Sequence, residues 1–145
     1  MKIFTMGFTK KTAKQFFDKI KDYNIQILID IRLNNRSQLA GFTKGTDLEF
    51  FLKEICQCEY VHVDYYAPTD EILSAYKKKK ITWNEYEKFY NDLICNRGVA
   101  GDFKNKFGEY DRVLLLCSEP TPENCHRRIL AEHIQGKLGY EILHI

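Results

Sequence analysis

The feature that most constrains the fold of this chain is an alternation of short apolar runs with amphipathic segments. Residues 25–31 and 112–117 are almost entirely apolar, which is typical of strands covered on both faces in a parallel sheet. Shorter strand-like runs lie at residues 3–6, 60–63 and 140–145. Parallel strands need long crossovers, and the segments between these runs have helical periodicity. The pattern predicts an α/β fold in one domain over residues 1–145. We expect a mostly parallel sheet of about five strands flanked by helices, with a helical insert after the third strand.

Capping signals predict where several of the helices begin. Thr9 is the expected N-cap of the first helix, because an amphipathic pattern with a 3.6-residue period follows it. Two later pairs have the spacing of a capping box, Thr46 with Glu49 and Thr82 with Glu85. Each pair predicts the start of a further helix.

Three longer segments complete the prediction. Residues 32–45 are polar and contain glycine, so we expect a long loop, and such loops in compact domains are often functional. Residues 99–111 are expected to be irregular apart from a helical turn around residues 103–107. Residues 125–138 are predicted to form the last helix.

Composition limits the class of protein. The chain has 145 residues, of which 44% are hydrophobic and 29% charged, so it can bury a core and is not a disordered chain. Its net charge of +2 does not indicate general nucleic-acid binding. Five cysteines, an odd number, favour reduced thiols over a disulfide framework. No apolar run is long enough for a membrane span and no secretory leader is evident, so we expect a cytoplasmic protein.

The predicted architecture indicates where a ligand would bind. In open parallel α/β sheets, ligands occupy the crevice beyond the carboxyl ends of the strands. Polar residues follow the predicted strands at that edge, and those chosen as candidate ligand contacts or reactive groups are Gly7, Thr9, Asp30, Arg32, Arg36, Ser37, Glu119, Cys125, His126 and Arg127.

The start of the last predicted helix is the most informative of these segments. Cys125, His126 and Arg127 lie where a helix offers free N–H groups and the positive end of its dipole. Cationic residues are unfavourable there, and a bound anion would offset that cost. Arg127 is expected to face the crevice and Arg128 to be partly solvated. A helix start beside cations would also lower the pKa of the Cys125 thiol.

Several of these residues have a purely structural alternative. Cys125 could fill space in the core, and for Cys117, at the end of an apolar run, that is the interpretation we favour. Asp30 could simply pair with Arg32, and Glu119 could be a loop charge or a general base. The lysines at 77–80 are interpreted as a solvated helix end.

A metal site is a further alternative. Cys117, Cys125 and His126 could supply soft ligands, but the spacing lacks the paired C-x-x-C motifs of structural zinc sites. We therefore predict no cofactor and do not favour a metal at these residues. Cys56 and Cys58 are interpreted as structural.

A series of short motifs also runs along the chain: Thr5-Met6-Gly7-Phe8-Thr9, Asp30-Ile31-Arg32 with Arg36-Ser37, Tyr60-x-His62, Ala67-Pro68-Thr69, Cys117-x-Glu119 and Cys125-His126-Arg127. In this order they resemble a bacterial and archaeal family, the domain of unknown function family number 488. The segment from Ala67 to Tyr90, with Trp83 and Tyr86, is similar to one subgroup. Asn35 departs from the family, which often has proline there. The resemblance implies an α/β fold and supports the site, but it implies no reaction.

Our leading hypothesis is an enzyme, a hydrolase or transferase, that acts on a phosphorylated or otherwise anionic substrate such as a nucleotide or a nucleic-acid component. The anion would be bound through Arg32, Arg36, Ser37, Arg127, Gly7 and Thr9. Cys125 or His126 would be the nucleophile or the acid/base, with Asp30 and Glu119 orienting or deprotonating. The alternative is a non-catalytic sensor that binds a nucleotide, an anion or a metal in the same crevice.

Overall fold

Five strands form one all-parallel sheet at the centre of the molecule, in the order β3-β2-β4-β1-β5. This is seen in a computed structural model that describes residues 1–36 and 40–145. The strand bounds are β1 Lys2–Gly7, β2 Ile27–Asp30, β3 Glu59–His62, β4 Arg112–Cys117 and β5 Glu141–His144. The predicted α/β fold with its parallel sheet is therefore confirmed.

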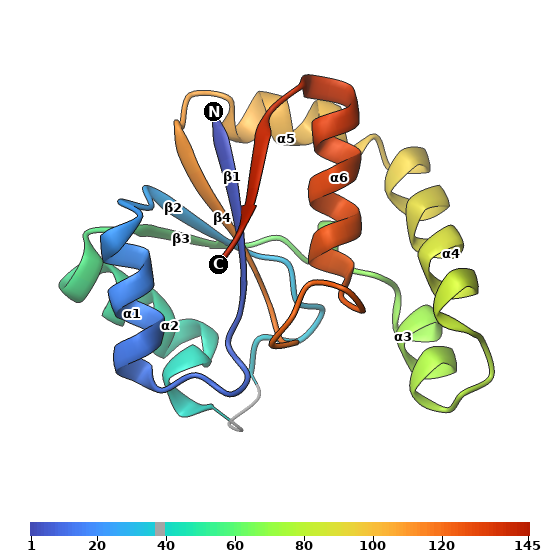
Figure 1. The fold of residues 1–145 in the computed structure, drawn as a ribbon, viewed down its shortest axis with the longest axis horizontal. Helices are drawn as coiled ribbons and strands as arrows, with labels where there is room; N and C mark the ends of the chain where they lie inside the picture. The colour runs from blue at the N-terminus through green and yellow to red at the C-terminus, as the bar shows by residue number, and fades with distance from the viewer. Residues whose placement is uncertain (37–39) are drawn as a thin grey trace.

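Helices cover both faces of the sheet (Figure 1). On one side lie α1 (Ala13–Asp22) and α2 (Gly45–Phe51), which a π-helical turn at Leu52–Cys56 extends. On the other side lie α4 (Trp83–Asn96), α5 (Val99–Phe107) and α6 (His126–Leu138). With α3 (Asp70–Lys77), the helices α4 and α5 form the helical insert that was predicted after the third strand. None of the described helices is both long and apolar enough to span a membrane.

Alternate residues of the central strands feed two separate hydrophobic cores. In β4, Val113 and Leu115 belong to the core beneath α4, α5 and α6, whereas Leu114 and Leu116 belong to the core beneath α1 and α2. All four side chains are fully buried. Burial on both faces explains why the strand sequence is a continuous apolar run without alternating polar residues.

The helix starts agree only in part with the capping signals. Thr82 and Glu85 form the predicted capping box of α4. The prediction for Thr9 is wrong, because α1 is capped by Thr12 in a reciprocal box with Gln15.

Two further predictions about helices are wrong. No capping box starts α2: its N-cap is Lys44 without a side-chain bond, and the Gly45 N–H donates instead to the Asn35 carbonyl at 2.8 Å. The segment expected to be irregular is helical over Val99–Phe107. It starts directly after Gly98, which ends α4 with a φ of 64°, a conformation that glycine adopts without strain.

Gly7 lets two segments meet at the carboxyl edge of the sheet. It ends β1 beside Cys117 of β4, and a Cβ atom added at Gly7 would lie 1.5 Å from the carbonyl oxygen of Glu119. The loop after β4 therefore passes directly over the end of β1, and only glycine leaves room for it.

We expect Gly7→Ala to destabilise the protein by about 1–3 kcal/mol, because the loop after β4 would have to move away from β1. The matched control is Gly136→Ala in α6, where an added Cβ meets nothing within 4 Å. That control should stabilise the protein by about 0.5–1 kcal/mol, because glycine is a poor helix residue. Urea denaturation of the three proteins measures both effects, and equal midpoints for Gly7→Ala and wild type would refute the close approach.

Candidate functional site

A cavity of about 480 Å³ opens at the carboxyl edge of the sheet. It is bounded by the segment after β2, by α3 and the start of α4, and by the loop that joins β4 to α6. Its polar and aromatic lining residues include Arg32, Asn34, Asp70, Ser74, Tyr76, Lys77, Trp83, Tyr86, Cys117, Glu119, Cys125 and His126. The size is typical of small-molecule sites, so the predicted crevice exists and could hold a ligand.

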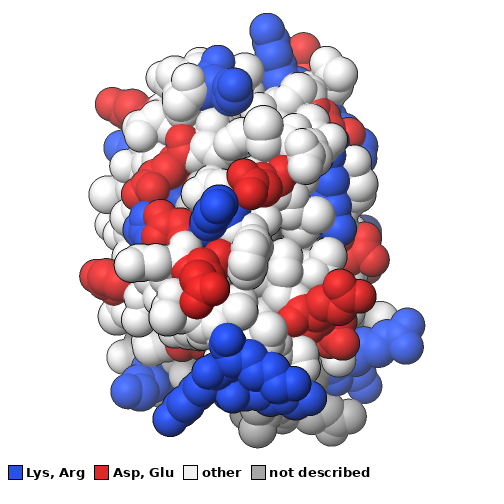
Figure 2. Space-filling view, turned by 90° about the vertical axis from the view of Figure 1, so that its right-hand side faces the viewer, with Lys and Arg blue, Asp and Glu red and all other residues white. Residues whose placement is uncertain are grey.

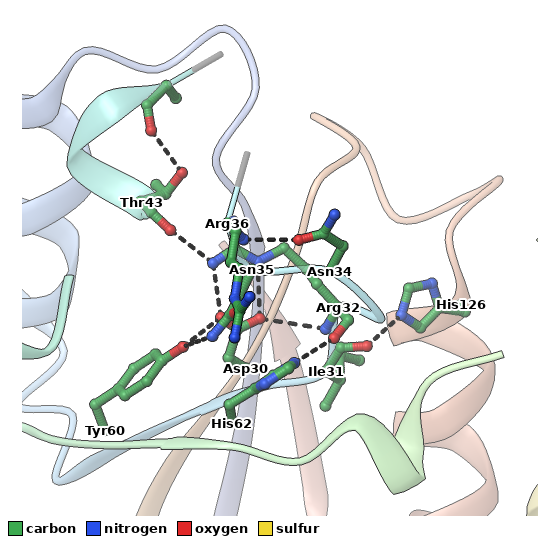
Figure 3. A network of polar contacts seen from close by, with 11 residues as sticks. Asp30, Ile31, Arg32, Asn34, Asn35, Arg36, Thr43, Tyr60, His62 and His126 are labelled. Carbon is green, nitrogen blue, oxygen red and sulfur yellow. Dashed lines mark hydrogen bonds and ion pairs between the residues drawn. The ribbon is translucent and has the colours of Figure 1, made fainter. Parts of the chain in front are cut away.

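A buried ion pair lies at the end of β2, and its arginine lines the cavity. Arg32 binds Asp30 through two hydrogen bonds, from Nε to Oδ1 at 2.8 Å and from Nη2 to Oδ2 at 2.6 Å (Figure 3). Only 4% of Arg32 and none of Asp30 is exposed. Nη2 also donates to the Thr43 carbonyl at 2.7 Å, and the Tyr60 hydroxyl donates to Asp30 Oδ2 at 2.7 Å. Burial and the neighbouring Asp30 carboxylate raise the pKa of Tyr60, so its hydroxyl stays a donor.

One donor of this buried arginine is left over. Nη1 of Arg32 has no hydrogen-bond partner among the residues that the structure describes. The ring of Phe8 lies 5.2 Å from the guanidinium carbon, and the His62 Nε2 donates to the Arg32 carbonyl at 2.6 Å. The side chain and the backbone of Arg32 are therefore both fixed, while the two N–H groups of Nη1 have no acceptor among the described residues.

Two thiols and an imidazole gather where β4 ends and α6 begins, and all three line the cavity. Sγ of Cys117, Sγ of Cys125 and a ring nitrogen of His126 lie within 4.8 Å of one another, and all three residues are buried. His126 Nε2 is 2.9 Å from the Ile31 carbonyl, and since a carbonyl can only accept, this nitrogen carries the proton. The ring of Tyr90 meets the imidazole edge to face at 5.6 Å. These are the described residues that could hold a soft metal ion.

The two thiols differ in acidity, opposite to the sequence prediction. Burial alone would raise the pKa of Cys117, but the Cys125 thiol as a donor, the Ser118 backbone N–H and the charge of Arg127 outweigh it and lower this pKa. The pKa of Cys125 is raised, because its thiol is hydrogen-bonded to Cys117 and is buried. The prediction that the helix start lowers the pKa of Cys125 is therefore wrong, and the thiol interpreted as core filler is the more acidic one.

Arg127 lies behind the cavity. It is 1% exposed, and its Nη1 donates to the Glu119 carbonyl at 2.5 Å, which fixes the loop after β4. It is not among the residues that line the cavity. Arg128 is partly solvated as predicted, and it pairs with Glu87 at 3.4 Å and Glu132 at 3.0 Å.

Comparison with known proteins decides the family. The profile of the family described as "Domain of unknown function DUF488" matches residues 12–134. The chain belongs to this family. The matched range includes both the Asp30–Arg32 pair and the Cys117/Cys125/His126 group. No curated protein and no solved structure matches the chain.

Of the other predicted site residues of this DUF488 chain, Gly7, Thr9, Asp30 and Arg36 are not among the residues that line the cavity. Asp30 is behind Arg32, Gly7 packs against the Glu119 backbone, and Thr9 is an exposed residue whose hydroxyl donates to the Ser118 carbonyl at 2.5 Å. Arg36 is exposed. Ser37 lies outside the described residues. Their roles in ligand binding remain predictions.

Sequence reasoning missed an aromatic wall that the helical insert supplies. Trp83 and Tyr86 stack with ring centroids 4.8 Å apart and planes 18° apart, and Tyr76 packs against both at 5.5 and 5.2 Å. The helical spacing of these aromatics indicates a buried helix face. The same spacing does not reveal that part of this face borders a cavity. The motif of Trp83 and Tyr86 that resembles a DUF488 subgroup was the available signal.

Charged groups surround the mouth of the cavity on this side. Figure 2 shows the face that carries α3 and α4, with basic side chains gathered at its lower end. The run Lys77–Lys80 is exposed, and Lys77 is also a lining residue. Asp70 and Glu119 supply acidic groups to the same lining.

The buried pair predicts a large stability effect. Asp30→Asn should destabilise the protein by about 3–5 kcal/mol, because Arg32 would remain buried without its counter-charge. Asp18→Asn is the control, since Asp18 pairs with Lys14 on the surface of α1 and should matter by less than about 0.5 kcal/mol. Urea denaturation at neutral pH compares the two, and similar losses would show that the buried pair is not needed for stability.

Proposed function

We propose that the protein is a hydrolase or transferase that acts on a small phosphorylated substrate of the nucleotide class, bound in the cavity at the carboxyl edge of the sheet. The observation that carries the proposal is the buried Arg32, which lines this cavity and whose Nη1 has no hydrogen-bond partner among the described residues. The reacting centre in this proposal is the group Cys117, Cys125 and His126, which lines the same cavity.

The phosphate end of the substrate is assigned to Arg32 and the start of α6. A buried donor without a partner costs about 1–3 kcal/mol, and an anionic oxygen would remove that cost with a charge-assisted hydrogen bond. The positive end of the α6 dipole lies on the same side, because Cys125 is the N-cap and His126 the first helical residue. Two independent sources of positive potential therefore support an anion in this cavity.

The ring of a nucleotide matches the remaining wall. Trp83, Tyr86 and Tyr76 form a cluster of aromatic rings at the cavity, and Trp83 is only partly buried. Every nucleobase has a π face that can stack on such rings. Asn34, Ser74 and Asp70 line the same space and supply hydrogen-bonding groups for base or sugar edges.

The chemistry of the proposal follows from what faces the substrate. Glu119 lines the cavity and can carry a proton during hydrolysis or transfer. The same cavity would serve a sensor, so turnover separates the two classes. Incubation with a panel of nucleotides and phosphoesters should give products with wild type. Tight binding without turnover across the panel would place the protein in the sensor class.

The role of Arg32 gives a binding prediction. Inorganic phosphate and nucleoside monophosphates should raise the melting temperature of wild type, with a stabilisation of about 2.7 kcal/mol at a hundredfold excess over the dissociation constant. Arg32→Lys should lose most of this ligand-induced shift, because lysine cannot keep the fork on Asp30 and also offer a further N–H. Lys79→Ala, an exposed residue outside the cavity lining, should keep the full shift. An undiminished shift in Arg32→Lys would contradict the assignment.

The aromatic wall gives a second, separate prediction. Trp83→Leu should weaken binding of a nucleoside monophosphate by about 1–3 kcal/mol, because a base loses its stacking partner. Binding of inorganic phosphate should not change, since phosphate has no ring. Phe89→Leu in the same helix is the control, because Phe89 is 41% exposed and does not line the cavity. Isothermal titration with both ligands measures the effects, and equal weakening for both would remove the base from this wall.

A further inference from the structure

We infer that Cys117, Cys125 and His126 form a zinc site with three protein ligands and a fourth position open to the cavity. The inference stands on the geometry of these side chains and does not rest on the proposed nucleotide substrate. It goes beyond the interpretation of the sequence, in which a metal was not favoured because the cysteines lack the paired C-x-x-C spacing.

The fold brings the three ligands together from two places. Cys117 is the last residue of β4, whereas Cys125 and His126 are the N-cap and first residue of α6. Their ligand atoms lie within 4.8 Å of one another. The spacing along the chain does not resemble a zinc motif because the loop of residues 118–124, and not a tight turn, closes the group.

One of the separations already matches that between two ligands of a tetrahedral ion. With Zn–S of about 2.3 Å and Zn–N of about 2.0 Å, sulfur and nitrogen on one zinc ion lie about 3.5 Å apart. Cys117 Sγ is 3.4 Å from His126 Nδ1. Because it is also 3.6 Å from Nε2, the sulfur lies beside the ring, and the two side chains must turn toward a common centre to bind the ion.

The imidazole is already held as a metal-ligating histidine usually is. Its Nε2–H donates to the Ile31 carbonyl, which leaves the lone pair of Nδ1 free, with Cys117 Sγ 3.4 Å from that nitrogen. Metal-ligating histidines typically donate their other N–H to a carbonyl or carboxylate in this way.

Ligand type and charge favour zinc. Thiolate and imidazole prefer zinc over the hard ions magnesium and calcium. Two thiolates neutralise the charge of one Zn²⁺, so the site with its ion would carry no net charge. This suits a buried place near the positive charge of Arg127, which acts on Cys117.

Three ligands leave one position for water or substrate. Closed structural zinc sites have four protein ligands, whereas catalytic sites have three and an open position. Cys117, Cys125 and His126 all line the cavity, and so does Glu119, whose carboxylate can accept a proton there. Zinc at this position would lower the pKa of a bound water to near neutrality, which suits hydrolysis.

The test begins with the metal content of the full chain purified from zinc-supplemented cells. Elemental analysis should give one zinc per wild-type chain. Cys117→Ser and Cys125→Ser should lose zinc affinity by more than the roughly 10–100-fold that loss of an outer-shell partner costs. Cys58→Ser and His133→Asn are the controls. Cys58 is an equally buried cysteine in the other core, His133 lies in α6, and both should keep the metal.

A second measurement covers the case in which a ligand variant does not fold. Wild type freed of metal with a chelator should melt at a higher temperature when zinc is added back. Cobalt added to the same protein should give thiolate-to-cobalt charge-transfer absorption together with the intense visible bands of a tetrahedral site. No zinc in wild type and no effect of added zinc would overturn the inference, as would cobalt absorption without the thiolate band or one equivalent of copper or iron in place of zinc.

The phosphate-induced melting shift, measured on the metal-free wild type and on metal-free Arg32→Lys, separates this inference from the proposed function. If that shift depends on Arg32 while zinc does not bind, only the zinc site fails. If zinc binds and phosphate gives no shift, only the anion site fails.

Discussion

The buried ion pair between Asp30 and Arg32 is the interaction on which the carboxyl edge of the sheet depends. Removing two charges from water costs several kcal/mol for each ion, and only good geometry offsets that cost. Here the pair is bidentate, and the Tyr60 hydroxyl and the Thr43 carbonyl occupy further positions. These partners come from β2, β3 and the turn Gly41–Thr43, so one pair connects three segments of the chain. Nη1 of Arg32, which has no partner among the described residues, has a fixed place because the other nitrogens of the guanidinium are bound.

Most of the architecture could be predicted because it follows from which faces of the strands are buried. Continuous apolar runs require cover on both faces, and that requirement alone leads to parallel strands with helical crossovers. Helix boundaries were harder, because tertiary contacts can replace local caps. Gly45 donates its N–H to Asn35, ten residues earlier, and no local pattern around Thr46 reports that contact. The helix α5 was missed because glycines at both ends conceal the buried i, i+4 residues Val99, Phe103 and Phe107.

The position of the cavity could be predicted from the sequence, but the roles of the individual side chains around it were harder to predict. The rule that ligands bind at the carboxyl edge selected Arg32, Glu119, Cys125 and His126, which line one cavity. It also selected Asp30 and Arg127, which do not. The acidity of the two thiols could not follow from the sequence, because it depends on which sulfur donates to the other and on the Ser118 backbone N–H. Arg127 shows the same limit. Its distance along the helix from Cys125 says nothing about the Glu119 carbonyl that its guanidinium binds.

The backbone at the end of β2 links the buried Arg32 to the group Cys117, Cys125 and His126. The Ile31 carbonyl accepts from His126, while the next carbonyl, of Arg32, accepts from His62. Ile31 is itself held by its N–H to the Leu116 carbonyl at 3.1 Å, one residue before Cys117. Peptide groups at the end of the sheet therefore place the imidazole and the backbone of Arg32 beside the cysteine that ends β4, while Asp30 holds the guanidinium. Because the entropy of ordering these groups is lost on folding, a ligand that meets them loses less on binding. A rigid arrangement of this kind suits a site that must hold an anion and a reactive centre at a fixed separation.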